Sequence, residues 1–262
     1  MRSMKRGDKT IVFVDLLGFA QLTEDWPRRI VHRRHGSMRT RSTSDASNRL
    51  SSFHNILDQM VHEFTLMTNS IQAMSFSDCA FVLVGNSYLS AEFAVELMQH
   101  YIRAFVPVRM GIAAGTFWPG RQSSDVAGGT VISRNIFYGT AIVRAHRAES
   151  NGLAGMRIFL HESLNGVPSF GPRPVLRFDK PANGVFGELS YLYDQHQYRN
   201  VSVRGDAETD DMTLWVHASD LRDSVEKKAR PRVHQQYAQT LAALNRMRVA
   251  SGRTKFERIR RS

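Results

Sequence analysis

Apolar residues recur with the period of a β-strand in several short runs along the chain. The first run is KTIVFVDL, residues 9–16, and two more, IQAMSF and CAFVLV, lie on either side of Ser77-Asp78. Further runs are PVRMGIAAG, which closes at Gly115, and GMRIFLHESL, which leads into a short turn. Each run is short enough for a strand and is bounded by polar or glycine-containing segments, so we predict five strands here.

Between these strands, apolar residues recur at helical spacing. The segments of about 47–67 and about 90–105 each carry one apolar stripe, and a third helix is predicted from Gly139 onward. The stripe of the first helix consists of Leu50, Phe53, Ile56, Leu57, Met60, Val61 and Phe64. The resulting order, βαββαβαβ, is typical of an α+β protein built as a ferredoxin-like βαββαβ sandwich.

Other segments do not fit this alternation. Glycine and polar residues at 119–129 predict a loop, and the Arg- and Ser-rich segment of about 26–50 predicts an insert. The stretches RPVLRFDKPANGVFGELSYLYD and MTLWVHASDL are interpreted as extra strands near the C-terminus. Residues 225–249 are predicted to form an exposed basic helix. We therefore expect a main domain over residues 1–221 and a basic helical extension over 222–262.

Composition excludes several classes of protein. Of 262 residues, 42% are hydrophobic, which is enough for a packed core. No apolar run approaches the roughly 20 residues that span a bilayer, and the polar, basic start MRSMKRGDK does not resemble a secretory signal. The single cysteine, Cys79, excludes an internal disulfide and a cysteine-based zinc site. The expectation is a soluble cytoplasmic protein with no membrane partner.

The net charge of +11 is unevenly distributed. Residues 26–50 hold seven arginines against one acid, and residues 222–262 hold twelve basic residues against three acids, so the rest of the chain is net acidic. A basic tail can bind nucleic acid, but the tail has few aromatic residues to stack on bases. Because Leu241, Leu244 and Met247 recur at helical spacing, packing of the tail on a dimer is the favoured alternative.

One aspartate interrupts the first apolar run. In a strand, Ile11, Phe13 and Asp15 share one face, while the alternate residues share the other. A buried carboxylate needs a cation, a hydrogen-bond donor or solvent, and Asp78 poses the same question at the tip of the second hairpin. Two carboxylates at neighbouring strand ends would suit a hard cation such as Mg²⁺ or Mn²⁺ shared with phosphates. For either aspartate alone, a turn cap is the simpler interpretation.

Four motifs occur in one order along the chain: FVDLLGF, FSDCAFVLVG, VRMGIAAG and YGTAIVRAHRAES. Together they resemble the catalytic domain of the class III nucleotide cyclases, and the resemblance covers about residues 10–164. It implies that Asp15 and Asp78 hold two ions, Mn²⁺ or Mg²⁺, with the Leu16 carbonyl as a further ligand. It also implies cyclisation of a nucleoside triphosphate by its ribose 3′-hydroxyl, with release of pyrophosphate.

The same resemblance assigns the phosphate contacts. The backbone amides of Gly18 and Phe19 would cover the β- and γ-phosphates, and Arg109 would touch the triphosphate. Arg147 would stabilise charge that develops on the α-phosphate, reaching across a dimer interface. A homodimer with two shared sites is therefore implied.

The positions that read the base depart from the usual pattern. Met74 and Ile136 stand where adenylate cyclases have a lysine and an aspartate, and Val143 replaces the asparagine that orients the ribose. Apolar side chains cannot hydrogen-bond to the edge of adenine, and the polar pair of a guanylate cyclase is also missing. Phe13 is a further predicted substrate contact. With these apolar replacements, the sequence resembles the bacterial pyrimidine cyclases of Pycsar anti-phage systems. These make a cyclic nucleotide that activates a partner effector protein, and we expect UTP in preference to CTP.

Two alternatives stay open. One is an adenylate or guanylate cyclase with an atypical base pocket. The other is an inactive cyclase-like module that only binds. Burial of two carboxylates costs free energy, so their retention, together with that of Arg147, favours an active enzyme. A diguanylate cyclase is disfavoured because SFSDCAF lacks the signature of that class.

Overall fold

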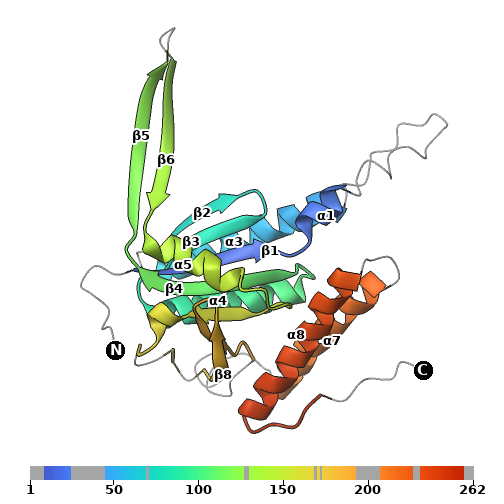
Figure 1. Ribbon diagram of the computed structural model, residues 1–262. Helices are drawn as coiled ribbons and strands as arrows, with labels where there is room; N and C mark the ends of the chain where they lie inside the picture. The colour runs from blue at the N-terminus through green and yellow to red at the C-terminus, as the bar shows by residue number, and fades with distance from the viewer. Residues whose placement is uncertain are drawn as a thin grey trace, which may run out of the picture.

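The computed structural model describes residues 9–24, 45–68, 71–126, 130–167, 170–171, 173–192, 207–226 and 231–256. Its centre is a seven-stranded sheet in the order β2-β3-β1-β4-β7-β9-β8 (Figure 1). The strands are β1 (Lys9–Leu16), β2 (Gln72–Phe76), β3 (Cys79–Leu83), β4 (Val108–Gly115), β7 (Ile158–His161), β8 (Val175–Ala182) and β9 (Val185–Leu189). Strand β1 is antiparallel to both β3 and β4, whereas β4 and β7 are parallel. The predicted α+β sandwich is confirmed.

The two faces of β1 enter different cores, as the alternation of its residues predicts. Val12, Val14 and Leu16 lie in the larger core, together with apolar residues of α3 (Asp45–Thr68) and α4 (Ser87–Arg103). Ile11 and Phe13 lie in a smaller core, covered by α5 (Thr140–Glu149). Gly111 on β4 permits this cover, because a Cβ there would collide with the Ala145 carbonyl and come within 2.6 Å of the Glu149 nitrogen.

The predicted loop at 119–129 is wrong for most of its length. Strand β5 (Trp118–Val126) pairs with β6 (Thr130–Tyr138) in register over nine residue pairs, and the two form a sheet of their own. Figure 1 shows this hairpin projecting away from the seven-stranded sheet. A ribbon that stands away from the core does not need the alternating apolar residues by which a half-buried strand is predicted.

The prediction of a strand at 212–221 is also wrong, because this segment belongs to helix α7 (Ala207–Glu226). Its buried residues recur at helical spacing: Asp211, Leu214, Trp215, Ala218 and Leu221. The strands predicted within 173–194 are confirmed as β8 and β9. Helix α8 (Pro231–Ala250) follows and lies beside α7.

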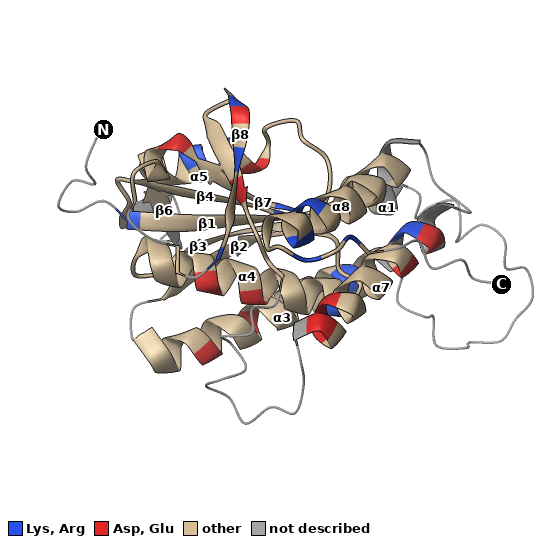
Figure 2. Cartoon of the chain, turned by 90° about the horizontal axis from the view of Figure 1, so that it is seen from below, with Lys and Arg blue, Asp and Glu red and all other residues tan. Residues whose placement is uncertain are grey.

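The C-terminal helix is not the exposed basic helix that was predicted. Leu241, Leu244 and Met247 are buried in the larger core of their own chain, so they are not free to pack on a second copy. Arg248 pairs with Glu208 at 2.7 Å, and Arg253 pairs with Asp211. Charges of both signs lie along the helical pair (Figure 2). The arginines of this region therefore tie α8 and the segment after it to α7.

The predicted domain boundary after residue 221 falls inside α7, and the division into two folding units stays a prediction. Residues 25–44, most of the predicted Arg-rich insert, lie outside the described residues. Across the described part of the chain, none of the helices combines the length and apolar character needed to cross a membrane.

Glu188 forms a buried ion pair with Arg157 and a second, half-exposed one with Arg246 of α8, and loss of the buried pair is expected to be costly. Glu188 on β9 is fully buried and pairs with Arg157, while Arg246 of α8 lies 3.2 Å from its other oxygen. Glu188→Ala would leave the buried Arg157 without its partner. We expect the free energy of unfolding to fall by about 3–5 kcal/mol, measured by urea denaturation. Arg246→Ala removes a half-exposed partner and should cost less than about 1 kcal/mol; equal losses would contradict this account.

Candidate active site

The structure brings the two predicted metal ligands together at one end of β1. Asp15 pairs in register with Cys79, the first residue of β3, and with Arg109 on β4. The backbone nitrogen of Leu16 donates a hydrogen bond of 2.8 Å to the carbonyl of Asp78. Asp78 therefore lies in the β2–β3 turn directly beside the end of β1. Both aspartates are half-buried.

The turn after β1 has the geometry that its glycine predicts. Gly18 has φ +75°, a left-handed conformation that glycine adopts without strain. The nitrogen of Leu17 donates to the carbonyl of Pro107 at 2.8 Å, which fixes the start of the turn. Helix α1 (Phe19–Glu24) begins immediately afterwards. The turn is thus held next to the two aspartates, and the phosphate contacts assigned to Gly18 and Phe19 stay a prediction.

The carboxylate of Asp15 is in an environment that disfavours its charge. Burial, followed by the nearby carboxylates of Glu149 and Asp78, raises the pKa of Asp15 to about 7, and Arg109 only partly opposes this. Crowded, partly desolvated carboxylates of this kind are suited to a divalent cation, which would favour their charged form. Among the described residues, no group of three or more His, Cys, Asp or Glu side chains could hold a metal on its own. Two aspartates would therefore need oxygen ligands from the backbone or a substrate.

Sequence reasoning missed one residue of this cluster, Glu149. Its carboxylate accepts a hydrogen bond of 2.6 Å from Nε of Arg109, and Nη1 of Arg109 also donates to the carbonyl of Leu153 at 3.1 Å. The side chain of Glu149 is only 4% exposed. The signal for it was available, since Glu149 follows Ala145 and Ala148 on the buried face of α5, where a carboxylate requires a partner.

The predicted substrate contacts Phe13, Met74, Ile136 and Val143 differ in burial. Met74 and Phe13 belong to the smaller core, where the ring of Phe13 lies 4.5 Å from that of Phe81 between centroids. Ile136 on β6 is half-buried. Val143, by contrast, is 51% exposed.

Val143 and Arg147 lie one turn apart on the exposed side of α5, whereas the buried residues of this helix face the sheet. Within one chain, Arg147 is therefore directed away from the sheet that carries Asp15. The contact of Arg147 across a dimer interface stays a prediction.

A solved cyclase structure shares this arrangement of sheet and helices. A bacterial light-regulated adenylyl cyclase aligns with a TM-score of 0.51 and 11% identity, over 83% of this chain and 59% of that chain. The chain has the fold of a nucleotide cyclase domain. The adenylyl cyclase CyaB from P. aeruginosa has a TM-score of 0.47 at 17% identity, covering 72% of this chain and 96% of that chain.

A second comparison concerns the guanylyl cyclase domain of the RhoGC fusion protein from the aquatic fungus Blastocladiella emersonii. It has a TM-score of 0.46 at 14% identity, over 71% of this chain and 97% of that chain. At such identities the likeness concerns the cyclase fold alone. No family model matches the sequence, and no curated protein matches it either.

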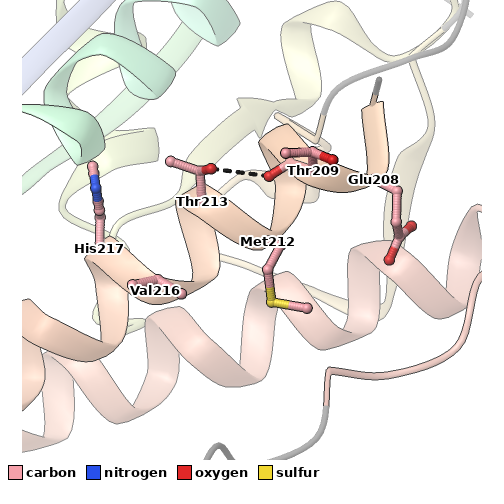
Figure 3. A pocket seen from close by; sticks show the side chains of 6 residues that line it. All are labelled: Glu208, Thr209, Met212, Thr213, Val216 and His217. Atoms are coloured by element: carbon pink, nitrogen blue, oxygen red, sulfur yellow. Dashed lines mark hydrogen bonds between the residues drawn. The ribbon is translucent and has the colours of Figure 1, made fainter. Parts of the chain in front are cut away.

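A hollow on α7 lies apart from this site. Its described lining residues all come from one helix: Glu208, Thr209, Met212, Thr213, Val216 and His217 (Figure 3). The hydroxyl of Thr213 donates to the carbonyl of Thr209 at 2.9 Å, a bond within the helix. The hollow holds neither of the two aspartates, so the candidate site is assigned to the end of β1 instead.

The raised pKa of Asp15 predicts how the stability of the metal-free protein depends on pH. The pKa of Asp15 is about 7 in the folded protein, above its ordinary value of 3.8, so the folded protein binds this proton more tightly than the unfolded chain does. Protonation of Asp15 therefore stabilises the fold at low pH, and this stabilisation is lost as the pH rises from 4 to 7. Asp15→Asn should therefore be more stable than wild type in EDTA, by an amount that grows over that range and then levels off. Melting temperatures from pH 4 to 8 measure this; a variant that is less stable than wild type at pH 8 would contradict it.

Proposed function

We propose that the chain is a nucleotide cyclase that converts a nucleoside triphosphate into its 3′,5′-cyclic monophosphate and pyrophosphate. The observation that carries the proposal is the pair of half-buried carboxylates, Asp15 and Asp78, beside a glycine turn at the end of β1. The cyclase fold of the chain supports it. In this reaction the 3′-oxygen bonds to the α-phosphorus, the bond to pyrophosphate breaks, and the hydroxyl proton is released.

The chain's residues have separate roles in this proposal. Asp15, Asp78 and the Leu16 carbonyl would hold two divalent ions, Mn²⁺ or Mg²⁺. When bound, such ions favour loss of the hydroxyl proton and offset charge on the phosphates. The amides of Gly18 and Phe19 bind the terminal phosphates. The protein thus contributes mainly positioning and electrostatic stabilisation.

Two arginines complete the phosphate contacts. Arg109 lies on the strand next to Asp15 and binds the triphosphate. Arg147 lies on the exposed side of α5 and stabilises charge at the α-phosphate of a substrate held by a second copy of the chain. The active form is therefore a homodimer with two shared sites, and the isolated chain is inactive.

For the substrate, we propose a pyrimidine nucleotide, UTP in preference to CTP. Met74 and Ile136, at the two positions proposed to read the base, are apolar and offer no side-chain hydrogen bond to the edge of a purine. Phe13 is a further proposed substrate contact, and Val143 stands at the position that orients the ribose. The product, cyclic UMP, would be a second messenger in anti-phage defence, made in the cytoplasm and sensed by a separate effector protein. Neither a membrane nor a nucleic acid has a part in this proposal.

Incubation of the purified protein with each of ATP, GTP, CTP and UTP and with Mn²⁺ tests the function, with products identified by mass spectrometry. The proposal predicts cyclic UMP as the main product. Conversion of ATP or GTP alone would support a purine cyclase with an atypical pocket. Absence of any cyclic product with either Mn²⁺ or Mg²⁺ would overturn the enzymatic proposal in favour of a binding module.

A further inference from the structure

We infer that Glu149 is a positioning residue of the proposed site, which holds the guanidinium of Arg109 beside Asp15 for contact with the triphosphate. The inference rests on the proposed function and adds a residue to it. No role was assigned to Glu149 by the sequence motifs. The geometry around Arg109 carries the argument.

Arg109 is held by two groups from the same part of the chain. Glu149, the last residue of α5, accepts from Nε and lies 2.5 Å from Nη2, and the carbonyl of Leu153 in the following segment accepts from Nη1. The Arg109 side chain is 15% exposed. An arginine side chain loses considerable rotamer freedom on being fixed, and these two acceptors fix it before any phosphate binds. Such pre-organisation lowers the cost of binding an anion.

The end of α5 is itself held firmly, so that Glu149 has a defined position. The helix packs directly on β4 at Gly111, where its backbone occupies the space of a Cβ. In the turn that follows, Nδ2 of Asn151 donates to the carbonyl of Ala148 at 2.6 Å, and Oδ1 of Asn151 accepts from the nitrogen of Leu153 at 2.7 Å. Both acceptors of Arg109 therefore belong to one closely bonded unit.

The placement of this unit relates it to the site rather than to general stability. Asp15 and Arg109 are direct neighbours across β1 and β4. The ion pair thus lies beside the proposed metal ligands. Glu149 and the Leu153 carbonyl therefore hold the guanidinium of Arg109 on the strand next to Asp15, close to where the proposed function places the triphosphate.

A binding experiment tests this role without relying on turnover. The probe is 3′-deoxy-UTP, which lacks the attacking hydroxyl and cannot cyclise, titrated with Mn²⁺ by calorimetry. Since hydrogen bonds to charged groups contribute enough for about a tenfold change in affinity, Glu149→Gln should raise the Kd by about tenfold. In turnover, KM for UTP should rise while kcat changes little. Glu149→Asp, which keeps the charge, should restore most of the affinity.

The matched control is Glu92→Gln. Glu92 on α4 forms a comparable pair with the buried Arg173, at 2.9 Å and 3.0 Å, but belongs to a different helix. The Glu92→Gln substitution should lower the melting temperature of the protein and leave the Kd for 3′-deoxy-UTP unchanged. In an Arg109→Gln background, Glu149→Gln should add no further loss, because its effect acts through Arg109. If Glu149→Gln itself fails to fold, Arg109→Gln takes its place, because Glu149 acts through Arg109: a rise in Kd of at least about tenfold is expected, and an unchanged Kd is the contrary result.

Two results would overturn the inference while leaving the proposed function intact. One is an affinity of Glu149→Gln equal to or tighter than wild type, which would make Glu149 a bystander or a competitor of the phosphates. The other is a full additional loss in the Arg109→Gln background. By contrast, a wild-type protein that neither binds the analogue nor cyclises any nucleotide would remove the proposed function itself.

Discussion

Replacement of Asp15 by asparagine is expected to reduce cyclase activity by at least about a thousandfold. The asparagine has nearly the same shape but lacks the negative charge, so only one of the two proposed metal-binding carboxylates, that of Asp78, remains. The fold should persist, because the substitution removes a charge that burial disfavours. Rates of cyclic nucleotide formation with Mn²⁺, together with circular dichroism, measure both effects.

Asp179→Asn is the matched control for this prediction. Asp179 is also a strand aspartate, but it lies exposed on β8, at the far edge of the sheet. Its replacement should leave activity within twofold of wild type, as surface substitutions usually do. If Asp15→Asn cyclises UTP as fast as Asp179→Asn, the carboxylate of Asp15 has no part in metal binding.

The second large effect concerns Arg147. Arg147→Ala should lower activity by about a hundredfold, because one charged group facing the α-phosphate is lost. Mixing it with Asp15→Asn should restore activity to about a quarter of wild type. Random exchange makes half of the dimers mixed, and each mixed dimer has one intact site, with Asp15 from one protomer and Arg147 from its partner.

A second mixture distinguishes a shared site from a site within one chain. Asp15→Asn mixed with Asp78→Asn should remain inactive, since both aspartates lie at the same end of β1 and serve one site. Two results would contradict the proposed division of the site between two protomers. One is recovery of activity in this mixture, and the other is no recovery of activity in the mixture of Asp15→Asn with Arg147→Ala. Size-exclusion chromatography establishes that each variant still forms dimers.

The sequence predicts well those elements that are half-buried. The two faces of β1 and the stripe of α3 each face a core, so their residues alternate with the period of the element. The β5–β6 hairpin and α7 were mispredicted for different reasons. The hairpin stands away from the core and carries no such period, whereas in α7 the apolar residues Leu214 and Trp215 are adjacent and, in a short window, look like part of a strand.

For the candidate site, the sequence motifs predicted which residues belong to it, but not which side chains contact them. Asp15 and Asp78 were expected at neighbouring strand ends, and the register of the sheet brings them there. The partner of Arg109 was not predicted, because Glu149 lies 40 positions further along the chain and only the packing of α5 on β4 brings the two together. The pairing of the C-terminal arginines likewise depends on contacts between α7 and α8 that no local pattern reveals.

The most direct measurement of the central claim is the position of bound Mn²⁺. Crystals grown with Mn²⁺ and 3′-deoxy-UTP would locate the ions by their anomalous scattering. The account predicts two peaks next to the carboxylates of Asp15 and Asp78, with oxygen ligands at about 2.0–2.6 Å, as for other hard cations. Bound nucleotide with its Mn²⁺ held by other residues, and with both aspartates uncoordinated, would contradict it.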